Sequence, residues 1–364
     1  MGIVRKFRKL TLHLLATANI LVVAALIATG YAGHVSPAAH PNFEVLALAF
    51  PIPLLMNLAF LLFWLVFHYK YAWIPIVGFL LCASPVRHYC PLNFSKKAPA
   101  DGIKVMTLNA NIFHYHHDTK ILPNPTMEYI CASDADIICL QESSIFRHRK
   151  KLTEQLEHTF RYVAYERHKH HERLAVLSKY PIVRHEEIAI DSRKNACGAF
   201  YLKVGSDTLL VINCHFETSA LSGKERDQFG DLVTRRSNSI NERSILHKLA
   251  FMGRRHAKQA NAVMAYIKKH RTKNMSVLVC GDFNDPPVSY AHHVFAKEFT
   301  DCHTASSTGP GFTHHAHGML LRIDHIFCSP DWEPFECEIH SKTAISDHYP
   351  VTCTLKKRQN PKNK

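Results

Sequence analysis

Polar residues that suit phosphate chemistry stand where apolar runs of the chain begin or end. A single Asp, Asn or His at such a place is usually a turn residue. In the region from about residue 101 to residue 355, however, five apolar runs each meet an acid, an amide or an imidazole. The ends of buried strands give rigid placement and open access, which an active site needs. The residues selected on this ground are Asn109, Glu142, His215, Asp282, Asn284, Asp324, Asp347 and His348.

Three carboxylates in this set suit a divalent cation. Glu142, Asp347 and Asp282 offer hard oxygen ligands. Mg²⁺ and Mn²⁺ prefer such carboxylates and water to thiolates. A cation held there would neutralise charge on a phosphoryl oxygen. The sequence therefore predicts a site for Mg²⁺ or Mn²⁺.

Two imidazoles and two amides add the remaining chemistry. His215 and His348 can donate hydrogen bonds or protons to a phosphoryl oxygen, and Asp324 can orient an imidazole. Asn109 and Asn284 can orient a phosphate oxygen or the attacking water without adding negative charge. With a cation, these groups predict the hydrolysis of a phosphate ester.

The elements that must position these residues alternate between short strands and helices. Ala260, Val263, Met264 and Ile267 recur at helical spacing and predict a helix over residues 255–269. No Gly-Ser linker or low-complexity tract interrupts this part of the sequence, so we expect one α/β sandwich-like domain with mixed strands. The expected strands are residues 103–108, 137–140, 175–177, 209–213, 277–280, 323–328 and 351–355.

The order of these motifs resembles the endonuclease/exonuclease/phosphatase superfamily. The resemblance runs over residues 103–355 and includes none of the first hundred residues. It implies a four-layer α/β sandwich, with two packed mixed sheets flanked by helices. Membrane-anchored bacterial members with several N-terminal spans look similar to the whole chain. The strings that carry the resemblance are Asn109, Gln141-Glu142, Leu177 to Pro181, Asn213 to His215, Gly281 to Asn284, Arg322 to Asp324, and Ser346 to His348.

The resemblance implies roles for the metal-site residues. Glu142 and Asp347 would bind the divalent cation, assisted by Asn109. Many nucleases of the superfamily have an acid two residues after this Asn, where the chain has Asn111. That departure weakens the case for a second metal and disfavours a DNA-repair nuclease.

The resemblance also implies the catalytic roles. Asp282 would align or deprotonate the attacking water, with Asn284 beside it. His348 would contact the scissile phosphate and hydrogen-bond to Asp324. His215 would contact the phosphate from the other half of the fold.

The net charge of +14 suggests nucleic-acid binding until it is divided along the chain. Residues 1–100 hold eight basic residues against the single acid Glu44, and residues 356–364 hold five basic residues and no acid. The remaining 31 basic and 29 acidic residues leave the expected catalytic region nearly neutral. A broad electrostatic footprint for nucleic acid is therefore not required.

The strongly apolar first hundred residues predict a membrane anchor. The uncharged run 10–28 follows a basic N-terminus and is long enough to cross a hydrocarbon core, which needs about 20 residues. A cleaved signal peptide is the alternative, but its apolar run is usually only roughly 7 to 15 residues long. A second run covers residues 45–67, where Pro51 and Pro53 would kink it, and a shorter third run covers residues 71–83.

We therefore expect three parts. They are a membrane anchor of two or three helices over residues 1–92, a catalytic domain over residues 101–355 and a basic tail over residues 356–364. The basic N-terminus should face the cytoplasm. If residues 71–83 cross the membrane, the catalytic domain lies outside the cytoplasm, which we favour; if they are re-entrant, it lies inside.

Cysteines are expected as buried core residues rather than disulfides or metal ligands, since the chain has no CxxC pair. This applies to Cys139, Cys214, Cys280, Cys328 and Cys353, which lie in apolar runs. Reduced thiols favour a cytoplasmic domain and so oppose the orientation preferred above.

Two functions from different classes fit these observations. The first is a membrane-anchored, metal-dependent hydrolase of phosphate esters, acting on a phospholipid headgroup, a small phosphodiester or a nucleic acid. The second is a catalytically silent membrane binding or scaffold protein that keeps the fold. The intact set of acids and imidazoles favours the enzyme, and the sequence indicates no protein partner.

Overall fold

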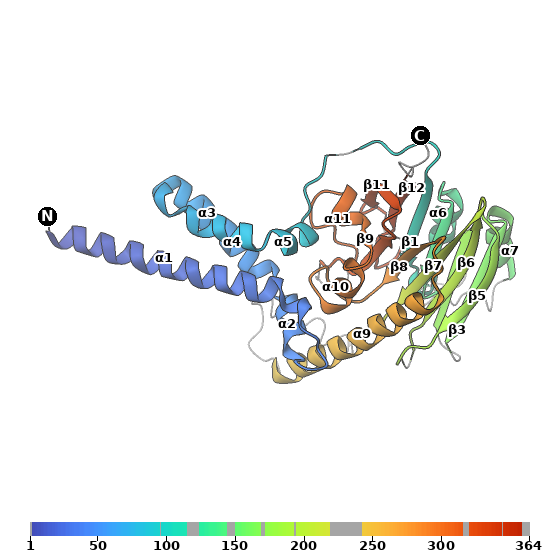
Figure 1. Cartoon of the computed structure of the whole chain (residues 1–364), viewed down its shortest axis with the longest axis horizontal. Helices are drawn as coiled ribbons and strands as arrows, with labels where there is room; N and C mark the ends of the chain where they lie inside the picture. The colour runs from blue at the N-terminus through green and yellow to red at the C-terminus, as the bar shows by residue number, and fades with distance from the viewer. Residues whose placement is uncertain are drawn as a thin grey trace.

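The structure, a computed structural model, describes residues 2–94, 96–114, 124–143, 150–168, 172–192, 194–218, 242–315, 320–343 and 345–358. Two six-stranded sheets pack face to face in its C-terminal part, which we call the sandwich (residues 103–357; Figure 1). The first sheet has the order β11(Trp332–Ile339), β12(Val351–Lys357), β1(Ile103–Asn109), β2(Ile137–Gln141), β4(Glu172–Ser178), β3(Tyr162–His168). The second has the order β5(Ile182–Ile188), β6(Cys197–Val204), β7(Asp207–His215), β8(Met275–Asp282), β10(Asp324–Cys328), β9(Thr300–Asp301).

Strand register brings the polar strand ends to one edge of the sandwich. β1 and β2 run parallel, with Asn109 opposite Gln141 at their carboxyl ends. β7 and β8 also run parallel, with His215 opposite Asp282. β10 is antiparallel to β8, so its first residue, Asp324, pairs with Asp282. Residues far apart in the sequence therefore meet where these strands end.

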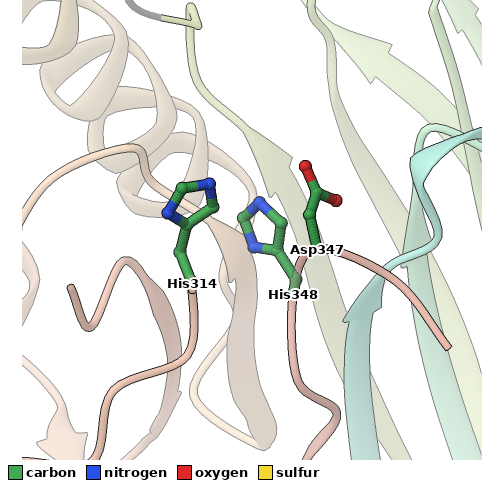
Figure 2. Close-up of side chains that lie close together, drawn as sticks. All are labelled: His314, Asp347 and His348. Atoms are coloured by element: carbon green, nitrogen blue, oxygen red, sulfur yellow. The ribbon is translucent and has the colours of Figure 1, made fainter. Parts of the chain in front are cut away.

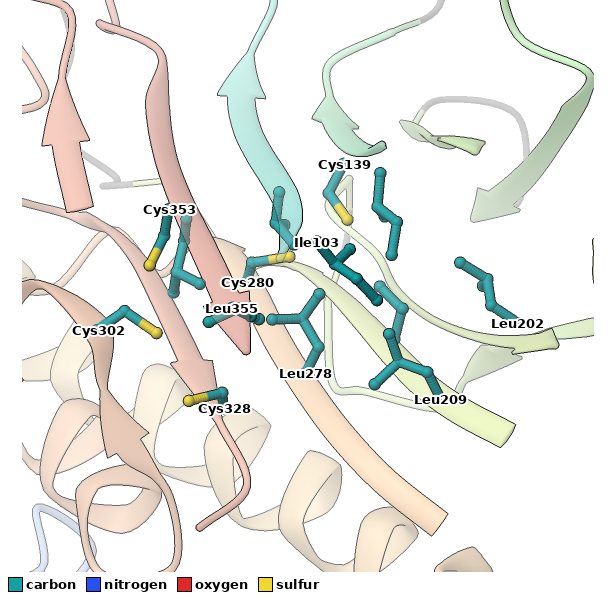
Figure 3. Close-up of a cluster of buried hydrophobic side chains, with 14 of the residues drawn as sticks. Ile103, Cys139, Leu202, Leu209, Leu278, Cys280, Cys302, Cys328, Cys353 and Leu355 are labelled. Carbon is teal, nitrogen blue, oxygen red and sulfur yellow. The ribbon is translucent and has the colours of Figure 1, made fainter. Parts of the chain in front are cut away.

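Apolar side chains fill the space between the sheets and the space under the helices. Between the sheets, Val105, Phe200 and Leu278 belong to one buried cluster. The five cysteines that the sequence predicts as core residues are buried free thiols, which confirms that prediction. Four of them are labelled in Figure 3. The labelled cluster in that figure mixes their sulfurs with leucine side chains such as Leu209 and Leu355.

Helices cover both outer faces, so the sandwich has the four layers that the sequence predicts. α6(Pro125–Ala132) and α7(Lys150–Thr159) bury Met127, Ile130 and Leu156 against the first sheet. α9(Glu242–His270) and α10(Tyr290–Ala296) bury side chains such as Val263 and Phe295 against the second. The short α11(Cys302–Ser306) follows β9. The helix predicted over residues 255–269 is the C-terminal half of α9.

Before the sandwich lies a helical part, residues 2–94, which we call the N-terminal segment. Among the described residues, only one helix, Val4–His34, is long and apolar enough to cross a membrane by itself. Two further stretches are long and apolar enough to cross only if each bent pair of helices counts as one span. The two pairs bend by 45° and 71°. The elements are α1(Gly2–Gly30), η1(Ala32–His34), α2(Asn42–Leu48), α3(Pro51–Phe67), η2(Tyr69–Tyr71), α4(Trp73–Leu81) and α5(Ala83–Tyr89).

The apolar run 45–67, predicted as a second span, is divided between two helices just before Pro51, which was expected to kink it. α2 ends at Leu48 and α3 begins at Pro51, because proline suits the first turn of a helix but not its interior. α3 returns along α1, and buried polar side chains tie it to α1 and to α4. Trp64 Nε1 donates to Asn19 Oδ1 of α1 over 2.9 Å, and Asn57 Nδ2 donates to the Pro75 carbonyl of α4 over 3.0 Å.

The N-terminal segment is attached directly to the sandwich. The Asn93 side chain donates to the carbonyls of Thr304 and Ser307, at 3.0 and 2.6 Å. The buried guanidinium of Arg322 donates to the His88 carbonyl at the end of α5. Arg322, which directly precedes Ile323 and Asp324 of the site, therefore connects the sandwich to the N-terminal segment.

Candidate active site

The eight residues selected from the sequence come together at one end of the sandwich. Asp324 and His215 are buried, and the other six residues line a single pocket. The pocket-lining members of the set are Asn109, Glu142, Asp282, Asn284, Asp347 and His348.

Asn109 bridges two of the carboxylates. Its Nδ2 donates to Glu142 Oε1 over 3.3 Å and to Asp282 Oδ2 over 3.1 Å. Its Oδ1 accepts the backbone N–H of Asn111 over 3.0 Å, which fixes the amide. Asn109 thus links the end of the first sheet to the end of the second.

Glu142 and Asn284 have an unusual backbone. Their φ angles are +49° and +51°, in the left-handed region that residues other than glycine rarely adopt. Each follows a strand end, and the turn aims the side chain back toward the pocket. Such strain persists only where the surroundings hold it, and it gathers at functional sites.

His215 faces two carboxylates from the end of β7. Its Nε2 is 3.8 Å from Glu142 Oε1 and 3.7 Å from Asp282 Oδ2. The side chain is 2% exposed, so it is held by packing rather than by solvent. Its position at the end of a buried strand fixes the direction of the ring.

His348 and Asp324 form a buried pair. His348 Nδ1 and Asp324 Oδ2 are hydrogen-bonded at 2.8 Å, and His348 Nε2 is 3.8 Å from Asp282 Oδ2. Burial alone would lower the pKa of His348, but the Asp324 and Asp282 carboxylates raise it to about 10. Burial would raise the pKa of Asp324, but the charge on His348 holds it below its usual range.

Asp282 is the most enclosed carboxyl group facing the pocket. Burial raises its pKa to about 6, against the lowering effect of His348 and His215. Asp282 Oδ1 accepts the backbone N–H of Asn284 over 2.8 Å, so Oδ2 is the oxygen turned toward the imidazoles. Asn284 in turn donates from Nδ2 to the Phe216 carbonyl over 3.0 Å.

The Ser346-Asp347-His348 turn is held against β1. Ser346 Oγ lies 2.7 Å from the Asn109 carbonyl, and it accepts the backbone N–H of His348 over 3.3 Å. The half-buried Asp347 side chain faces the pocket from this turn. The turn that opens the last strand therefore brings an acid and an imidazole to the carboxyl end of the first.

His314 belongs to the site, although we did not select it from the sequence. Its ring packs edge-on against that of His348, with the ring centroids 4.9 Å apart. Figure 2 shows the two rings side by side with Asp347 next to them, and ligand atoms of all three residues lie within 4.8 Å of one another. In a chain with 27 histidines, no local pattern separates His314 from the others.

Two buried amides fasten the sheets together under the site. Gln141 Nε2 donates to Asn213 Oδ1 over 2.6 Å, across the space between the sheets. Asn213 Nδ2 donates to the carbonyls of Leu140 and Ala175, at 3.0 and 3.2 Å. Both amides belong to strings that carry the family resemblance. Their role in joining the sheets could not be predicted, because it depends on contacts between distant parts of the chain.

Gln259 lies on the buried side of α9, and its side chain is fully enclosed. Its Oε1 accepts the Glu217 N–H over 3.0 Å, and its Nε2 donates to the Asp191 carbonyl over 3.0 Å. It thus supports the loop that follows His215.

Several sequence features lie outside the described residues. They include the stretch after Thr218, which contains Arg226, Arg235 and Arg236, the end of the expected basic tail, and four histidines of the strings 114–117 and 168–171. These residues are 219–241, 359–364, His116, His117, His170 and His171.

The chemistry of the pocket fits a hard divalent cation. Glu142, Asp282 and Asp347 supply anionic oxygens to it, and the described residues that line it include no thiol. Ligand atoms of Asp282, Asp324 and His348 also lie within 4.8 Å of one another. Oxygen ligands with imidazole nearby suit Mg²⁺ or Mn²⁺.

A family model provides the comparison that decides the family. The model of the endonuclease/exonuclease/phosphatase family matches residues 106–348, more than half of the chain. The chain belongs to the endonuclease/exonuclease/phosphatase family. Members of this family are hydrolases of phosphoester bonds. A second model, of a domain of unknown function, matches residues 12–89, and no curated protein matches the sequence.

Solved structures show the endonuclease/exonuclease/phosphatase fold at low sequence identity. A family member from Beutenbergia cavernae is 16% identical, with a TM-score of 0.50, 70% of this chain and 72% of that chain being covered. The catalytic domain of human Nocturnin with bound sulfate is 14% identical, with a TM-score of 0.49, 72% of this chain and 97% of that chain being covered. Truncated TDP2 of Caenorhabditis elegans is 15% identical, with a TM-score of 0.46 and coverages of 71% and 99%. At these identities the likeness concerns the fold alone.

Proposed function

We propose that the chain hydrolyses phosphate esters with the help of a divalent cation. The observation that carries this proposal is the position of Asp282, whose Oδ2 lies within 3.8 Å of both His215 and His348. A carboxylate flanked by two imidazoles, with further acids across the pocket, suits attack by water on a phosphate.

Glu142 and Asp347, assisted by Asn109, would hold Mg²⁺ or Mn²⁺. When bound, the cation supplies positive charge that neutralises a phosphoryl oxygen. Asn109 keeps the Glu142 carboxylate close to that of Asp282, and Ser346 keeps Asp347 at the end of β1.

Asp282 orients the attacking water and accepts its proton. A pKa of about 6 leaves the carboxylate ionised near neutral pH yet basic enough to share a proton in the transition state. Asn284, held by its own hydrogen bond to the Phe216 carbonyl, orients the water or a phosphate oxygen beside it.

The imidazoles stabilise the charge that develops on the phosphate. His348, paired with Asp324, is protonated at neutral pH and donates from Nε2. His215 donates from the opposite strand end. Donors fixed in a buried site need no reorganisation during the reaction, so they favour the transition state.

The direct test is hydrolysis by the full-length chain in detergent. We expect bis-p-nitrophenyl phosphate to be cleaved with Mg²⁺ or Mn²⁺, and the activity to disappear with EDTA and return with added metal. Panels of phospholipid, sugar phosphate and nucleic acid would then rank the substrates. A well-folded protein that cleaves none of them with metal present would instead support the silent scaffold.

We also propose that the N-terminal segment anchors the chain with several spans and leaves the sandwich outside the cytoplasm. α1 supplies one span, and α3 and α4 supply the others, whereas α2 stays outside the hydrocarbon core because its Glu44 lines the catalytic pocket. The basic N-terminus then stays in the cytoplasm. A C-terminal reporter that fluoresces only in the cytoplasm should remain dark, and bright cells would contradict this orientation.

A further inference from the structure

The N-terminal segment forms part of the wall of the catalytic pocket. Glu44 and Leu48, one helical turn apart on α2, line the same pocket as Asp282 and His348. Both lie outside the residues that match the endonuclease/exonuclease/phosphatase family model. Figure 1 shows α2 beside α9, just past the end of α1 that is nearer the sandwich. The pocket is thus shared between the sandwich and the segment before it.

α2 and α9 approach each other closely because α9 has a glycine at the contact. A Cβ atom at Gly253 would lie only 2.2 Å from Glu44 Cγ, so the position has room for hydrogen alone. Glycine inside a helix costs roughly 0.5 to 1 kcal/mol relative to alanine. Here it allows Glu44 to enter the pocket with only 4% of its surface exposed.

The Glu44 carboxyl group is incompletely bound. Oε2 is 3.5 Å from the backbone N–H of Tyr290, and Oε1 has no hydrogen-bond partner among the described residues. A buried polar group without a partner costs free energy, so one that persists needs an explanation. A ligand in the pocket would supply the missing donor.

The imidazole of His256, which also lines the pocket, has a hydrogen-bond partner at each nitrogen. His256 Nδ1 is bonded to Asp285 Oδ1 and Nε2 to the Glu217 carbonyl, each at 2.7 Å. Burial would lower the pKa of His256, but Asp285 raises it to about 9, so the ring is a cation whose hydrogen atoms both have acceptors. Glu44 interacts with this pair only through space.

Apolar side chains flank the carboxyl group. Leu48 from α2 lines the pocket together with Leu249 and Met252 from α9. The wall of the pocket therefore includes, besides the catalytic acids and imidazoles, the Glu44 carboxyl group together with aliphatic side chains and the His256–Asp285 pair.

We infer that Glu44 and Leu48 complete the substrate site. The substrate is a phosphate ester whose organic part donates a hydrogen bond to Glu44 from an ammonium group and has apolar atoms that contact Leu48 and Met252. This inference rests on the proposed hydrolysis of phosphate esters. A lipid headgroup and a soluble phosphodiester share that chemistry, so the experiment must separate them.

The test uses the full-length chain in detergent with Mn²⁺ and pairs of esters that differ in one donor. Glycerophosphoethanolamine has N–H groups, whereas glycerophosphocholine has none; bis-p-nitrophenyl phosphate is the reference without a donor. We expect kcat/KM to favour the ethanolamine ester by about tenfold or more, because a site built for a donor rejects the analogue that lacks it. The same comparison is made with vesicles of phosphatidylethanolamine and of phosphatidylcholine. A preference for ethanolamine that is seen only with vesicles would show that the substrate is a lipid.

Glu44→Met, which keeps the length of the side chain but removes the acceptor, should abolish the preference mainly through KM. Glu44→Gln, which keeps one acceptor oxygen, should retain part of it. In each variant the readout is the ratio of kcat/KM for the ethanolamine ester to that for the choline ester, so a general change in activity cancels. The control is Glu298→Gln, at an exposed acid paired with Lys268.

Equal rates in the wild type on the two soluble esters and also on the two kinds of vesicle, or a preference that survives in Glu44→Met, would overturn the inference while leaving the proposed function intact. A chain that cleaves no ester at all, bis-p-nitrophenyl phosphate included, would overturn both. Melting temperatures show that each variant is folded.

Discussion

Asp282→Asn is expected to lower kcat for bis-p-nitrophenyl phosphate by about a thousandfold, within the range that removal of a general base produces. The substitution keeps the shape of the side chain and one acceptor for the Asn284 N–H. It removes the charge that attracts the proton of the attacking water and that faces both His215 and His348. Because the loss occurs in the transition state, KM should change little.

The same variant should not be less stable than the wild type. Burial disfavours the charged form of Asp282, as its raised pKa shows, so a neutral amide removes an unfavourable charge. Thermal unfolding should therefore occur at an equal or higher temperature. Asp207→Asn, at the other end of β7 and paired with Lys357 at the surface, is the matched control. Activity of Asp282→Asn within tenfold of the wild type would refute its assigned role.

The strands that position the site could be predicted from local sequence, because each is a short apolar run. β1, β2, β7 and β8 bury nearly every residue, and the polar residue at each end breaks the run visibly. Strand ends of parallel neighbours fall at one edge of a sheet, so convergence of the selected residues followed from the same pattern.

The sequence did not predict β5, because much of this strand faces solvent. β5, at the edge of the second sheet, has the string Arg184-His-Glu-Glu187 and mostly exposed or half-buried residues. No apolar run marks it, and its pairing with β6 is determined by tertiary contacts instead. Strand propensity depends on such neighbours as much as on the residues themselves.

The sequence did not predict that α2 and His314 belong to the site, because both depend on contacts between distant parts of the chain. Hydropathy assigned the region of α2 to the start of a membrane span, although Glu44 packs against Gly253, more than two hundred residues away. A lone Glu in an apolar stretch gives no local sign of its partner. His314 was missed for the same reason, since its role depends on its contact with His348.

Glu142→Gln is the second prediction with a large effect, and it concerns the cation. Glu142 is the carboxylate that follows β2 and is held by Asn109, and an amide in its place removes one negative charge from the ligand set. Affinity for a hard cation depends on the charge of its ligands, so the Mn²⁺ concentration for half-maximal activity should rise by roughly tenfold to a hundredfold. Glu333→Gln, at a surface acid near Lys96, should leave it unchanged.

The central claim is that acids from separate strand ends hold one divalent cation beside two imidazoles. The most direct measurement is titration of the full-length chain with Mn²⁺, followed by electron paramagnetic resonance. We predict one tightly bound Mn²⁺ per chain in the wild type and in Glu333→Gln, and weaker binding in Glu142→Gln. Absence of tight binding in the wild type, or equal binding in the wild type and Glu142→Gln, would contradict the claim.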